Sequence, residues 1–479
     1  MYTDIVVIGA GIGGIGFAVH IKQQLQNKSF LVLEDRASHG GTWDLFRYPG
    51  IRSDSDMNTF AYSFHPWNKP NYFSPGGSTL AYLQEVIDKY ELAPHLQFNH
   101  RVASAHFSSA TNMWELEVAV GKEIKKIQCR FLVGATGYYD FHNGHRPDFP
   151  GEEEFQGPIV HPQFWPKELD FVDKNVVVIG SGATAVTLVP NLVKQGAKHV
   201  TMLQRSPGYI LSMPDYDYTY AVLKYFLPKM WVFTIVRYKN AIMQNVFYRF
   251  CRAFPSLAKR LLRRLVALRV GQKVTDANFN PKYYPWEERL CLIPDNDLFD
   301  QINNKSVSVV TNTIKKFDSK GIELSDGKHL DTDIIVTATG LKLKLLGGIK
   351  FVVDGNPITS GECMFYKSCL ISKVPNYVHL VGYVNMSWTL KVDLAATYLC
   401  RLVKHMDAHN FTKFEAVPRG VNVTEKSIME LESGYVQRDK GVLPKQGDVG
   451  PWITVHSFFR DKKLLVKSPL EDEYLTFTK

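Results

Sequence analysis

The chain has 479 residues, of which 45% are hydrophobic and 22% charged, and it carries a formal net charge of +9 at pH 7. Its length exceeds what a single hydrophobic core usually holds, so we expect two or three domains. The composition is typical of a soluble globular protein, and the apolar runs are too short to form a membrane-spanning helix.

Six cysteines are scattered through the chain, and none of them forms a C-x-x-C pair. This spacing argues against a disulfide framework and against a zinc site, and it favours a reducing compartment. No basic stretch lies between Met1 and the first predicted strand, so we expect no secretory signal. We therefore predict a cytoplasmic protein without a metal ion.

The chain begins with a pattern that is typical of a dinucleotide-binding unit. An apolar strand over 5–8 leads into a G-x-G-x-x-G turn and then into a helix, and the glycines of the turn are Gly9, Gly11 and Gly14. A second apolar strand, over 30–33, ends at Glu34. The glycines allow the backbone to approach a pyrophosphate at the N-terminus of the helix. We expect Glu34 to accept hydrogen bonds from ribose hydroxyls.

The same unit recurs further along the chain. A strand over 175–179 precedes a second glycine-rich loop, whose expected cofactor contacts are Gly180, Gly182 and Thr184. The following strand, over 200–204, ends at Arg205 and Ser206 instead of at an acidic residue. An arginine in this place pairs with a 2′-phosphate, which a carboxylate would repel. The pattern favours NADP at the second site and FAD at the first, with an ordinary surface arginine as the alternative.

The two units predict an α/β fold with two Rossmann-like dinucleotide-binding domains, for FAD and for NADP, and an α-helical insertion. Val336–Gly340 repeats the pattern of Val133–Gly137, a strand that ends in a small-residue turn, and we interpret it as the return of the chain to the first domain. The predicted parts are 1–140 (FAD domain, first part), 150–212 (NADP domain, first part), 213–284 (helical insertion), 285–335 (NADP domain, second part) and 336–479 (FAD domain, second part, with the C-terminal region).

The predicted insertion carries the surplus of positive charge. Between Asp217 and Asp276 the chain has no acidic residue but twelve lysines and arginines. Within it a row of leucines recurs at helical spacing: Leu257, Leu261, Leu265 and Leu268. Basic amphipathic helices occur as solvated caps and also on anionic membrane surfaces. We expect a helical cap over the substrate cavity, with peripheral membrane contact through 218–275 as the alternative. No nucleic-acid motif accompanies the charge, so we expect no nucleic-acid partner.

A flavin site and a nicotinamide site in one chain imply hydride transfer from NADPH to FAD. Disulfide reductases share this two-site layout, but they need a redox-active pair of cysteines close to the flavin. None of the six cysteines forms a local pair. Molecular oxygen is therefore the expected electron acceptor.

Two phrases carry a resemblance to a known family. Residues 155–166 fit the spacing F-x-G-x-x-x-H-x-x-x-W-P, and residues 40–54 fit G-G-x-W followed by Y-P-G-x-x-x-D. No helix or strand periodicity places residues at these intervals. Both phrases resemble the fingerprints of type I Baeyer–Villiger monooxygenases. The resemblance covers essentially the whole chain, and its closest branch contains the ethionamide-activating and long-chain alkane monooxygenases.

The resemblance implies catalytic roles for two residues. Arg289 would lie above the flavin and stabilise the negative charge of a C4a-peroxyflavin, while Asp54 would hold Arg289 and the nicotinamide amide in place. A fixed cation beside a developing anion lowers a barrier strongly in a site that excludes water. Glu288 stands where acetone-type relatives often have a lysine near the NADP phosphate, which leaves Arg205 as the main phosphate contact.

The resemblance also assigns supporting residues. The residues that would line the flavin are Gly41, Thr42 and Trp43. Trp388 and Asn385 would lie near the substrate end of the cavity. The residues that would couple NADP binding to domain closure, without exchanging protons in the reaction, are Phe155, Gly157, His161, Trp165 and Pro166.

Together these patterns predict an FAD-containing monooxygenase that uses NADPH and O₂ to convert ketones to esters or lactones, with sulfoxidation of thioethers as a further activity. Two alternatives stay open at this point. One is N- or S-oxygenation, or long-chain alkane oxidation, by the same fold. The other is an uncoupled NADPH oxidase. The expected partners are a small hydrophobic substrate and O₂.

Overall fold

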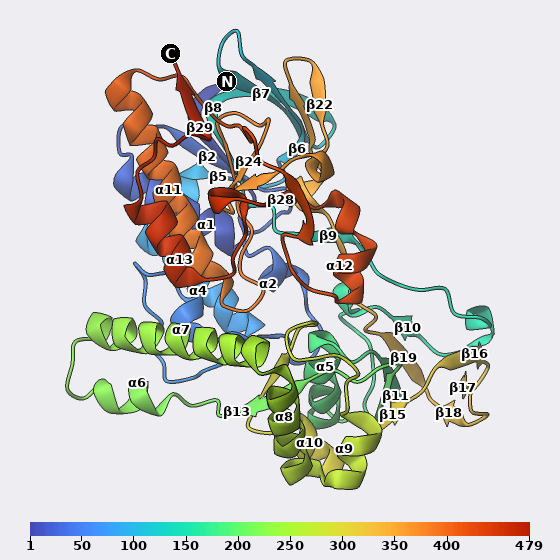
Figure 1. The fold of residues 1–479 in the computed structure, drawn as a ribbon. Coiled ribbons are helices and arrows are strands. Elements are labelled where there is room, and N and C mark those ends of the chain that lie inside the picture. Colours follow the sequence, from blue (N-terminus) through green and yellow to red (C-terminus); the bar gives the residue numbers. More distant parts are fainter.

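The computed structural model describes the whole chain, residues 1–479, apart from the side chain of Glu425. Two α/β units lie one above the other in Figure 1, and a group of long helices lies beside the lower unit. The upper unit is built from both ends of the chain and the lower unit from its middle. The second unit is therefore inserted into the first.

The first unit contains a nine-stranded sheet of order β22-β21-β6-β7-β8-β1-β2-β5, in which β25 also pairs with β8. Strands β25, β8, β1, β2 and β5 run parallel, whereas β6, β7 and β8 pair antiparallel. The long strand β8 serves both parts, because its first half pairs with β7 and its second half with β1. The strands are β1 (Tyr2–Ile8), β2 (Phe30–Leu33), β5 (Leu96–Gln97), β6 (Arg101–Ser108), β7 (Met113–Val120), β8 (Glu123–Gly134), β21 (Lys350–Val353), β22 (Asn356–Ile358) and β25 (Tyr377–His379).

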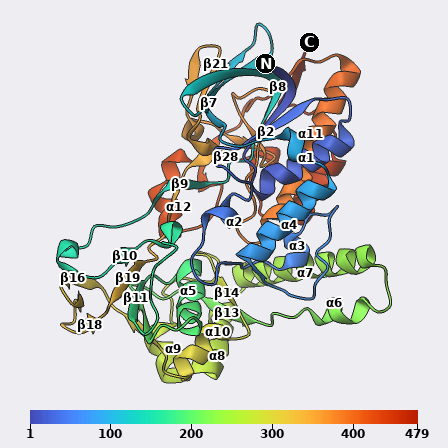
Figure 2. The ribbon, with the colours of Figure 1, turned by 180° about the vertical axis from the view of Figure 1, so that it is seen from behind.

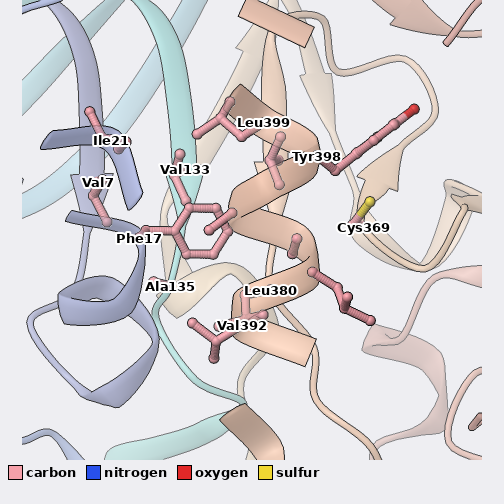
Figure 3. Close-up of a cluster of buried hydrophobic side chains, with 14 of the residues drawn as sticks. Val7, Phe17, Ile21, Val133, Ala135, Cys369, Leu380, Val392, Tyr398 and Leu399 are labelled. Carbon is pink, nitrogen blue, oxygen red and sulfur yellow. The ribbon is translucent and has the colours of Figure 1, made fainter. Parts of the chain in front are cut away.

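The parallel part of this sheet is buried, as its apolar, β-branched strands predict. Two helices, α1 (Ile12–Gln24) and α11 (Trp388–His409), pack together over one of its faces. Figure 3 shows Phe17 of α1 pointing toward Val392 and Leu399 of α11. All three side chains are fully buried. This core fixes the N-terminus of α1, and with it the first glycine-rich loop.

The second unit contains a five-stranded parallel sheet of order β10-β19-β11-β12-β15. Its elements are β10 (Ile159–Val160), β11 (Asn175–Ile179), α5 (Ala183–Lys194), β12 (His199–Gln204), α10 (Asp297–Asn303), β15 (Val307–Thr311) and β19 (Ile334–Thr337). The domain boundary expected between 335 and 336 lies inside β19, which pairs with β11 as far as Thr337. The second unit therefore extends through β19. This strand lies beside β11 as β8 lies beside β1, which explains the repeated sequence pattern.

The chain crosses between the two units on a pair of adjacent strands. It leaves the first unit through β9 (Tyr139–Gly144) and returns through β20 (Leu341–Leu343). These strands are antiparallel, and Leu341 lies opposite Gly144. The two crossings are therefore held side by side by backbone hydrogen bonds.

The expected helical insertion is present and is closed at its base by a parallel pair of strands, β13 and β14. Its elements are β13 (Ile210–Met213), α6 (Tyr218–Leu223), α7 (Lys229–Ala253), α8 (Pro255–Val270), α9 (Gln272–Asn278) and β14 (Cys291–Pro294). In Figures 1 and 2, α6 and its connection to α7 lie at the edge of the molecule. The predicted leucine row of α8 faces outward. The residues that α8 buries are Ala258, Leu262, Val266 and Val270.

The remaining labelled elements are shorter or lie on the surface. They are β3 (Arg52–Ser53), α2 (Thr42–Leu45), α3 (Met57–Phe60), β4 (Ser74–Pro75), α4 (Gly76–Lys89), β16 (Ile314–Asp318), β17 (Gly321–Leu324), β18 (His329–Asp331), β23 (Phe365–Tyr366), β24 (Leu370–Ile371), β26 (Lys413–Ala416), β27 (Val423–Ser427), α12 (Gly434–Arg438), β28 (Lys445–Gly447), α13 (Phe458–Asp461), the π-helical turn η8 (Lys462–Lys467) and β29 (Leu475–Thr478). Among the described residues, no helix combines the length and the apolar character that crossing a membrane requires.

Candidate active site

A cavity of about 630 Å³ opens at the carboxyl ends of β1, β2 and β8. Ligands of open parallel sheets bind at this edge, and the volume lies in the range of small-molecule sites. Nine residues expected from the sequence line it: Gly9, Gly11, Glu34, Gly41, Thr42, Trp43, Asp54, Arg289 and Trp388. No residue of the insertion, 213–284, is among the described lining residues. The helices of the insertion therefore do not line this cavity, and their expected role as a cap over the substrate stays a prediction.

The first glycine-rich loop needs its glycines for close backbone contacts. Gly9 has a φ of +103°, and a Cβ there would lie 2.6 Å from the carbonyl oxygen of Ala135 at the end of β8. A Cβ on Gly14 would lie 1.8 Å from the carbonyl oxygen of Gly9. Helix α1 begins at Ile12 without a side-chain cap, so its first N–H groups point toward the cavity edge and suit a pyrophosphate.

Glu34 lies at one end of the cavity and is 6% exposed. Its Oε2 accepts a hydrogen bond from the backbone N–H of Ala10 at 2.6 Å, and its Oε1 accepts one from that of Arg36 at 3.0 Å. Burial raises the pKa of Glu34, and these two hydrogen bonds oppose the rise. The carboxyl group is therefore fixed beside the glycine loop, where ribose hydroxyls of a bound dinucleotide would meet it.

A second close backbone approach in the loop region comes from the G-G-x-W phrase. Gly41 comes close to the first loop, since a Cβ on Gly11 would lie 3.6 Å from the Gly41 Cα. Thr42 and Trp43 begin α2, and the Trp43 ring meets Phe60 edge-on at 5.6 Å between ring centroids. These residues all line the cavity. Together with Glu34 and the first glycine loop, they fit an extended dinucleotide such as FAD.

Arg289 and Asp54 form an ion pair in the cavity. The distance from Arg289 Nη2 to Asp54 Oδ2 is 3.2 Å, and the two side chains are 35% and 31% exposed. Asp54 raises the pKa of the Arg289 guanidinium above its already high ordinary value, so Arg289 stays charged at every physiological pH. The cavity therefore contains a positioned, permanent cation that is still open to a ligand.

Aromatic side chains form the wall next to this ion pair. Tyr138 stacks on Trp388 with 5.1 Å between ring centroids, and the hydroxyls of Tyr138 and Tyr139 are hydrogen-bonded at 2.6 Å. All three residues line the cavity. Trp388 was expected here. Asn385 is buried and is not among the described lining residues; its side-chain amide donates to the His456 carbonyl at 3.0 Å.

Sequence reasoning missed the two tyrosines, although their place carried a signal. Tyr138 and Tyr139 directly follow the small-residue turn at the end of β8, and side chains at the carboxyl ends of parallel strands commonly contact ligands. Tyr435, on α12, lies near enough to Arg289 to interact with its charge. It comes from the C-terminal region, and no local pattern singles it out.

The second glycine-rich loop lies outside this cavity and repeats the geometry of the first. A Cβ on Gly180 would lie 2.3 Å from the Ala338 carbonyl oxygen at the end of β19, while the space around Gly182 is open. Helix α5 begins at Ala183 without a side-chain cap. Thr184 sits in its first turn beside the hydroxyl of Tyr48. The loop thus has the open helix N-terminus that a second pyrophosphate needs.

Arg205 and Ser206 follow β12 and are exposed beside this loop. The Ser206 carbonyl accepts a hydrogen bond from the Ser181 hydroxyl at 2.9 Å, which ties the strand end to the glycine loop. Burial raises the pKa of Glu288, whereas the charge of Arg205 lowers it. The guanidinium of Arg205 therefore has a carboxyl group in its surroundings, where acetone-type relatives often have a lysine.

The Y-P-G phrase joins the two units. Tyr48 belongs to the first unit by sequence, but it is buried in the hydrophobic core of the second, together with Phe46. Burial raises the pKa of Tyr48 to about 12, so its hydroxyl stays protonated. Arg52 then pairs with Asp297 of α10 at 2.9 Å. This docked segment places Asp54 against Arg289, which follows the insertion in the chain.

The phrase at 155–166 lies beside the strands that connect the units, and none of its residues lines the cavity. Phe155 is buried in the second unit, and Gly157 lies against the carbonyl group of Asp333. Trp165 packs at the edge of the second core, and the Pro166 carbonyl accepts a hydrogen bond from the Leu169 N–H at 3.5 Å. The phrase is therefore structural in its contacts, and its expected role in coupling stays a prediction.

His161 is the member of that phrase that contacts the connecting strands. Its Nε2 lies 3.2 Å from the carbonyl oxygen of Gly340, just before β20, and its Nδ1 accepts a hydrogen bond from the Gln163 N–H at 3.2 Å. A Cβ on Gly144, at the end of β9, would lie 2.4 Å from the ring. Burial lowers the pKa of His161, so the ring is neutral and donates from Nε2.

Comparison with known proteins shows to which family the chain belongs. A family model described as pyridine nucleotide-disulphide oxidoreductase matches residues 6–243. Over its whole length the chain is 44% identical to the probable FAD-binding monooxygenase AlmA of Acinetobacter baylyi, covering 96% of that protein. It is 43% identical over its whole length to the FAD-containing monooxygenase EthA of Mycobacterium tuberculosis, covering 98% of it. The chain belongs to the FAD-containing monooxygenases.

A solved structure shows that the fold is shared. The oxidised steroid monooxygenase bound to NADP superposes with a TM-score of 0.79, at 23% identity, over 100% of each chain. The predicted family and the predicted α/β fold with two Rossmann-like units are therefore confirmed. As an FAD-containing monooxygenase, this protein has FAD as its cofactor, in agreement with the residues that line the first cavity.

Cysteines separate this FAD-containing monooxygenase from the disulfide reductases, which the matching family model also describes. All six cysteines are buried and free, and none is among the described residues that line the cavity. Burial raises the pKa of Cys291 to about 12, which keeps its thiol protonated and unreactive. The described residues contain no group of side chains that could hold a metal ion.

Proposed function

We propose that this monooxygenase uses NADPH and O₂ to carry out Baeyer–Villiger oxidation of ketones. A ketone, O₂, NADPH and a proton give an ester or lactone, NADP⁺ and water; one oxygen atom is inserted between the carbonyl carbon and its substituent. The observation that carries the proposal is the Arg289–Asp54 ion pair within the cavity. Bound FAD supplies the acceptor for the hydride of NADPH and the activation of O₂.

Arg289 and Asp54 are the residues that we propose to act on the reacting atoms. Oxygen transfer to a carbonyl develops negative charge, and a cation that is already in place stabilises it without reorganisation. Asp54 holds the guanidinium and keeps it protonated. The stacked pair Tyr138 and Trp388 offers an apolar wall on which a hydrophobic substrate can lie.

The second glycine loop is the proposed NADPH site. Gly180 and Gly182 would approach the pyrophosphate, and Arg205 with Ser206 would contact the 2′-phosphate. The open space around Gly182 and the uncapped N-terminus of α5 support this assignment. We propose that His161 and Trp165 couple NADPH binding to the relative position of the two units, because His161 contacts both connecting strands.

Product analysis with the purified, FAD-loaded enzyme tests the proposed reaction. Ketones, thioethers and long-chain alkanes are supplied in turn with NADPH and O₂, and both the products and hydrogen peroxide are measured. Esters formed in proportion to the NADPH consumed support the proposal. Sulfoxides or alcohols without any ester would favour the N- or S-oxygenating or alkane-oxidising alternative. Hydrogen peroxide equal to the NADPH consumed, with every substrate, would identify an NADPH oxidase.

An Arg289→Ala variant tests the role of the cation. Loss of one preorganised group that stabilises developing charge typically lowers kcat by about 10²–10³-fold, and we expect a loss of this size in ester formation. The matched control is Arg419→Ala, because Arg419 is exposed in the C-terminal region and contacts only the Glu473 carbonyl. If Arg289→Ala forms ester as fast as the control, Arg289 is not catalytic.

We also propose peripheral contact with a membrane through residues 218–275. The specific observation is the number of large apolar side chains that α6, α7 and α8 expose to solvent. Exposed apolar surface of this extent marks an interaction site in a folded protein.

A further inference from the structure

The hairpin formed by α6 and α7, residues 218–253, carries exposed aromatic side chains at its outer end. Tyr225 and Phe226 in the connection are each 77% exposed, and Trp231 in the first turn of α7 is 66% exposed. The connection lies at the edge of the molecule in both Figure 1 and Figure 2. Aromatic rings of this size are normally buried, because each removes a large apolar area from water.

Helix α7 is apolar on two opposite sides. Val232, Phe233 and Val236 are buried against the body of the protein. A second row recurs at helical spacing on the outer side, and its exposed members are Trp231, Ile235, Ile242 and Val246. A surface helix normally presents polar residues on its outer side. The outer apolar row therefore lacks the covering that the inner row has.

The exposure does not come from a loosely attached helix. Arg237 on the inner side of α7 is 6% exposed and pairs with Asp393 of α11 at 2.9 Å. It also donates to the carbonyl oxygens of Asn58 and Thr59 in α3, each at 3.0 Å. These buried contacts fix the orientation of α7, and with it the direction in which the outer row faces.

Positive charge surrounds the exposed apolar surface. Residues 218–275 contain no acidic residue and twelve lysines and arginines, of which all but the buried Arg237 reach the surface. A groove next to α7 adds three more lysines, Lys462, Lys463 and Lys467, and Tyr238 of α7 forms its other side. Lys462 donates a hydrogen bond to the Tyr238 hydroxyl. None of the described residues that line this groove is acidic. The groove is therefore suited to an anionic group.

We propose that the α6–α7 hairpin docks on the surface of an anionic lipid membrane, with its aromatic end among the lipid head groups and the Lys462–Lys467 groove holding lipid phosphates. Exposed Trp and Tyr rings next to lysine and arginine are the combination found at membrane interfaces. A second copy of the chain is a poorer partner for this surface. It would bring an equally basic surface, and lysine is depleted at protein interfaces.

This inference rests on the proposed membrane contact and on no part of the oxygenation chemistry. The FAD-loaded protein is sedimented with vesicles of phosphatidylcholine alone and with vesicles rich in phosphatidylglycerol. We expect binding only to the anionic vesicles and release at high salt, because screening weakens the attraction of surface charges. Absence of binding to anionic vesicles at low salt would overturn both the membrane contact and the hairpin inference, whatever the enzyme does with ketones.

Two variants test the two parts of the surface. A triple variant, Tyr225→Ser with Phe226→Ser and Trp231→Ser, removes the aromatic end, and a second, Lys462→Gln with Lys463→Gln and Lys467→Gln, removes the charge of the groove. Each lysine near an anionic surface contributes about 1 kcal/mol, so we expect about a fivefold loss of vesicle affinity per lysine. The aromatic variant should bind at least about tenfold more weakly, since it leaves no interfacial aromatic anchor at the tip.

Matched controls separate these losses from general effects. Ile124→Ser with Val172→Ser removes exposed apolar side chains elsewhere, and Lys315→Gln with Lys316→Gln and Lys320→Gln removes the same charge from the β16–β17 hairpin. Both controls should bind vesicles like the parent protein. If the parent binds but the aromatic variant binds equally well, another surface makes the contact and the hairpin inference is wrong.

A readout at the hairpin itself completes the test. Adding anionic vesicles should shift the tryptophan emission to shorter wavelength, and Trp231→Phe should abolish the shift. A concentration-dependent dimer in solution, lost in the aromatic variant and unaffected by vesicles, would instead identify a second copy of the chain as the occupant. Turnover of a water-soluble substrate should be the same in all variants, because none of these residues lines the cavity.

Discussion

Replacing Arg237 by alanine should weaken the attachment of the helical insertion to the FAD-binding unit. Arg237 is 6% exposed, and its guanidinium donates to several acceptors at once. It pairs with Asp393 at 2.9 Å. It also donates to three backbone carbonyl oxygens, those of Asn58 at 3.0 Å, Thr59 at 3.0 Å and Ala61 at 2.5 Å.

The cost follows from what the alanine leaves behind. Asp393 would keep only His20 as a charged or ionisable side-chain partner, at 3.2 Å, and the three carbonyl groups would lose a buried donor. Removing one partner of a buried ion pair typically costs about 3–5 kcal/mol. Arg237→Lys is the matched control. Lysine keeps the positive charge but lacks the planar guanidinium, so this variant should lose roughly 1–3 kcal/mol of unfolding free energy.

Thermal unfolding, followed by circular dichroism and by the fluorescence of released FAD, measures the effect. A loss of this size corresponds to a fall in the unfolding temperature of roughly 3–5 °C for a chain of this length. FAD release should shift together with unfolding, since the Arg237 carbonyl contacts lie on the segment that also places Phe60 in the cavity. Unfolding of Arg237→Ala within about 2 °C of the parent would refute the reasoning.

The pH dependence adds a second check. Burial raises the pKa of Asp393, but the hydrogen bond from His20 and the charge of Arg237 outweigh it, so the pKa lies below its ordinary value. The stabilisation that ionised Asp393 provides is then fully present above its pKa of about 3.9 in the unfolded chain. It is lost as the pH falls through the lower pKa that Asp393 has in the folded protein. The difference between parent and Arg237→Ala should therefore be constant near neutral pH and shrink only in acid.

Other consequences of the structure are testable in the same preparation. Gly14→Ala should purify without FAD absorbance, because its Cβ would lie 1.8 Å from the Gly9 carbonyl oxygen and displace the start of α1. Burial lowers the pKa of His456 to about 4, so the free energy of unfolding should fall on the order of 3 kcal/mol between pH 6.5, its pKa of about 6.5 in the unfolded chain, and pH 4. A His456→Gln variant should show a flatter dependence of stability on pH, measured by urea titrations at several pH values. Arg205→Gln should raise the KM for NADPH by about 10–100-fold and leave the KM for NADH unchanged, as expected for the loss of a charge-assisted contact to the 2′-phosphate. Trp165→Ala should keep its FAD but release more hydrogen peroxide per NADPH than the parent, and an unchanged product yield would remove this residue from the coupling.

The parts of the fold that were predictable are those that local backbone chemistry determines. Both glycine loops, the strands before them and the helices after them follow from residues that are close in sequence. The same holds for Glu34, which ends a buried strand. Arg289 and Asp54 were named through family resemblance alone, since they come from segments far apart in the chain and meet only when the two units dock.

The features that were missed depend on tertiary choices. In α8 two apolar rows recur at helical spacing, and periodicity cannot tell which one packs inward. The row with Leu262 is buried, while the leucine row with Leu261 is exposed. In the sequence Arg237 is one of twelve basic residues between Asp217 and Asp276, and nothing distinguishes it from the others. Its partner Asp393 lies far away in the chain, and only the folded structure shows that the two form a buried ion pair. The insertion was expected as a cap over the substrate cavity; none of its residues lines the described cavity, and the cap stays a prediction.

Because the two crossing strands are paired, the second unit could be deleted from the chain as one piece. Because Gly144 and Leu341 face each other across β9 and β20, the ends of everything between them are adjacent, and a short turn could join them without straining the first unit. Such a deletion would also expose Phe46 and Tyr48, which are buried only in the core that would be lost. An excised FAD-binding unit would therefore need these two positions changed to polar residues. It would also leave Asp393 without its partner Arg237, and it would contain no Arg289.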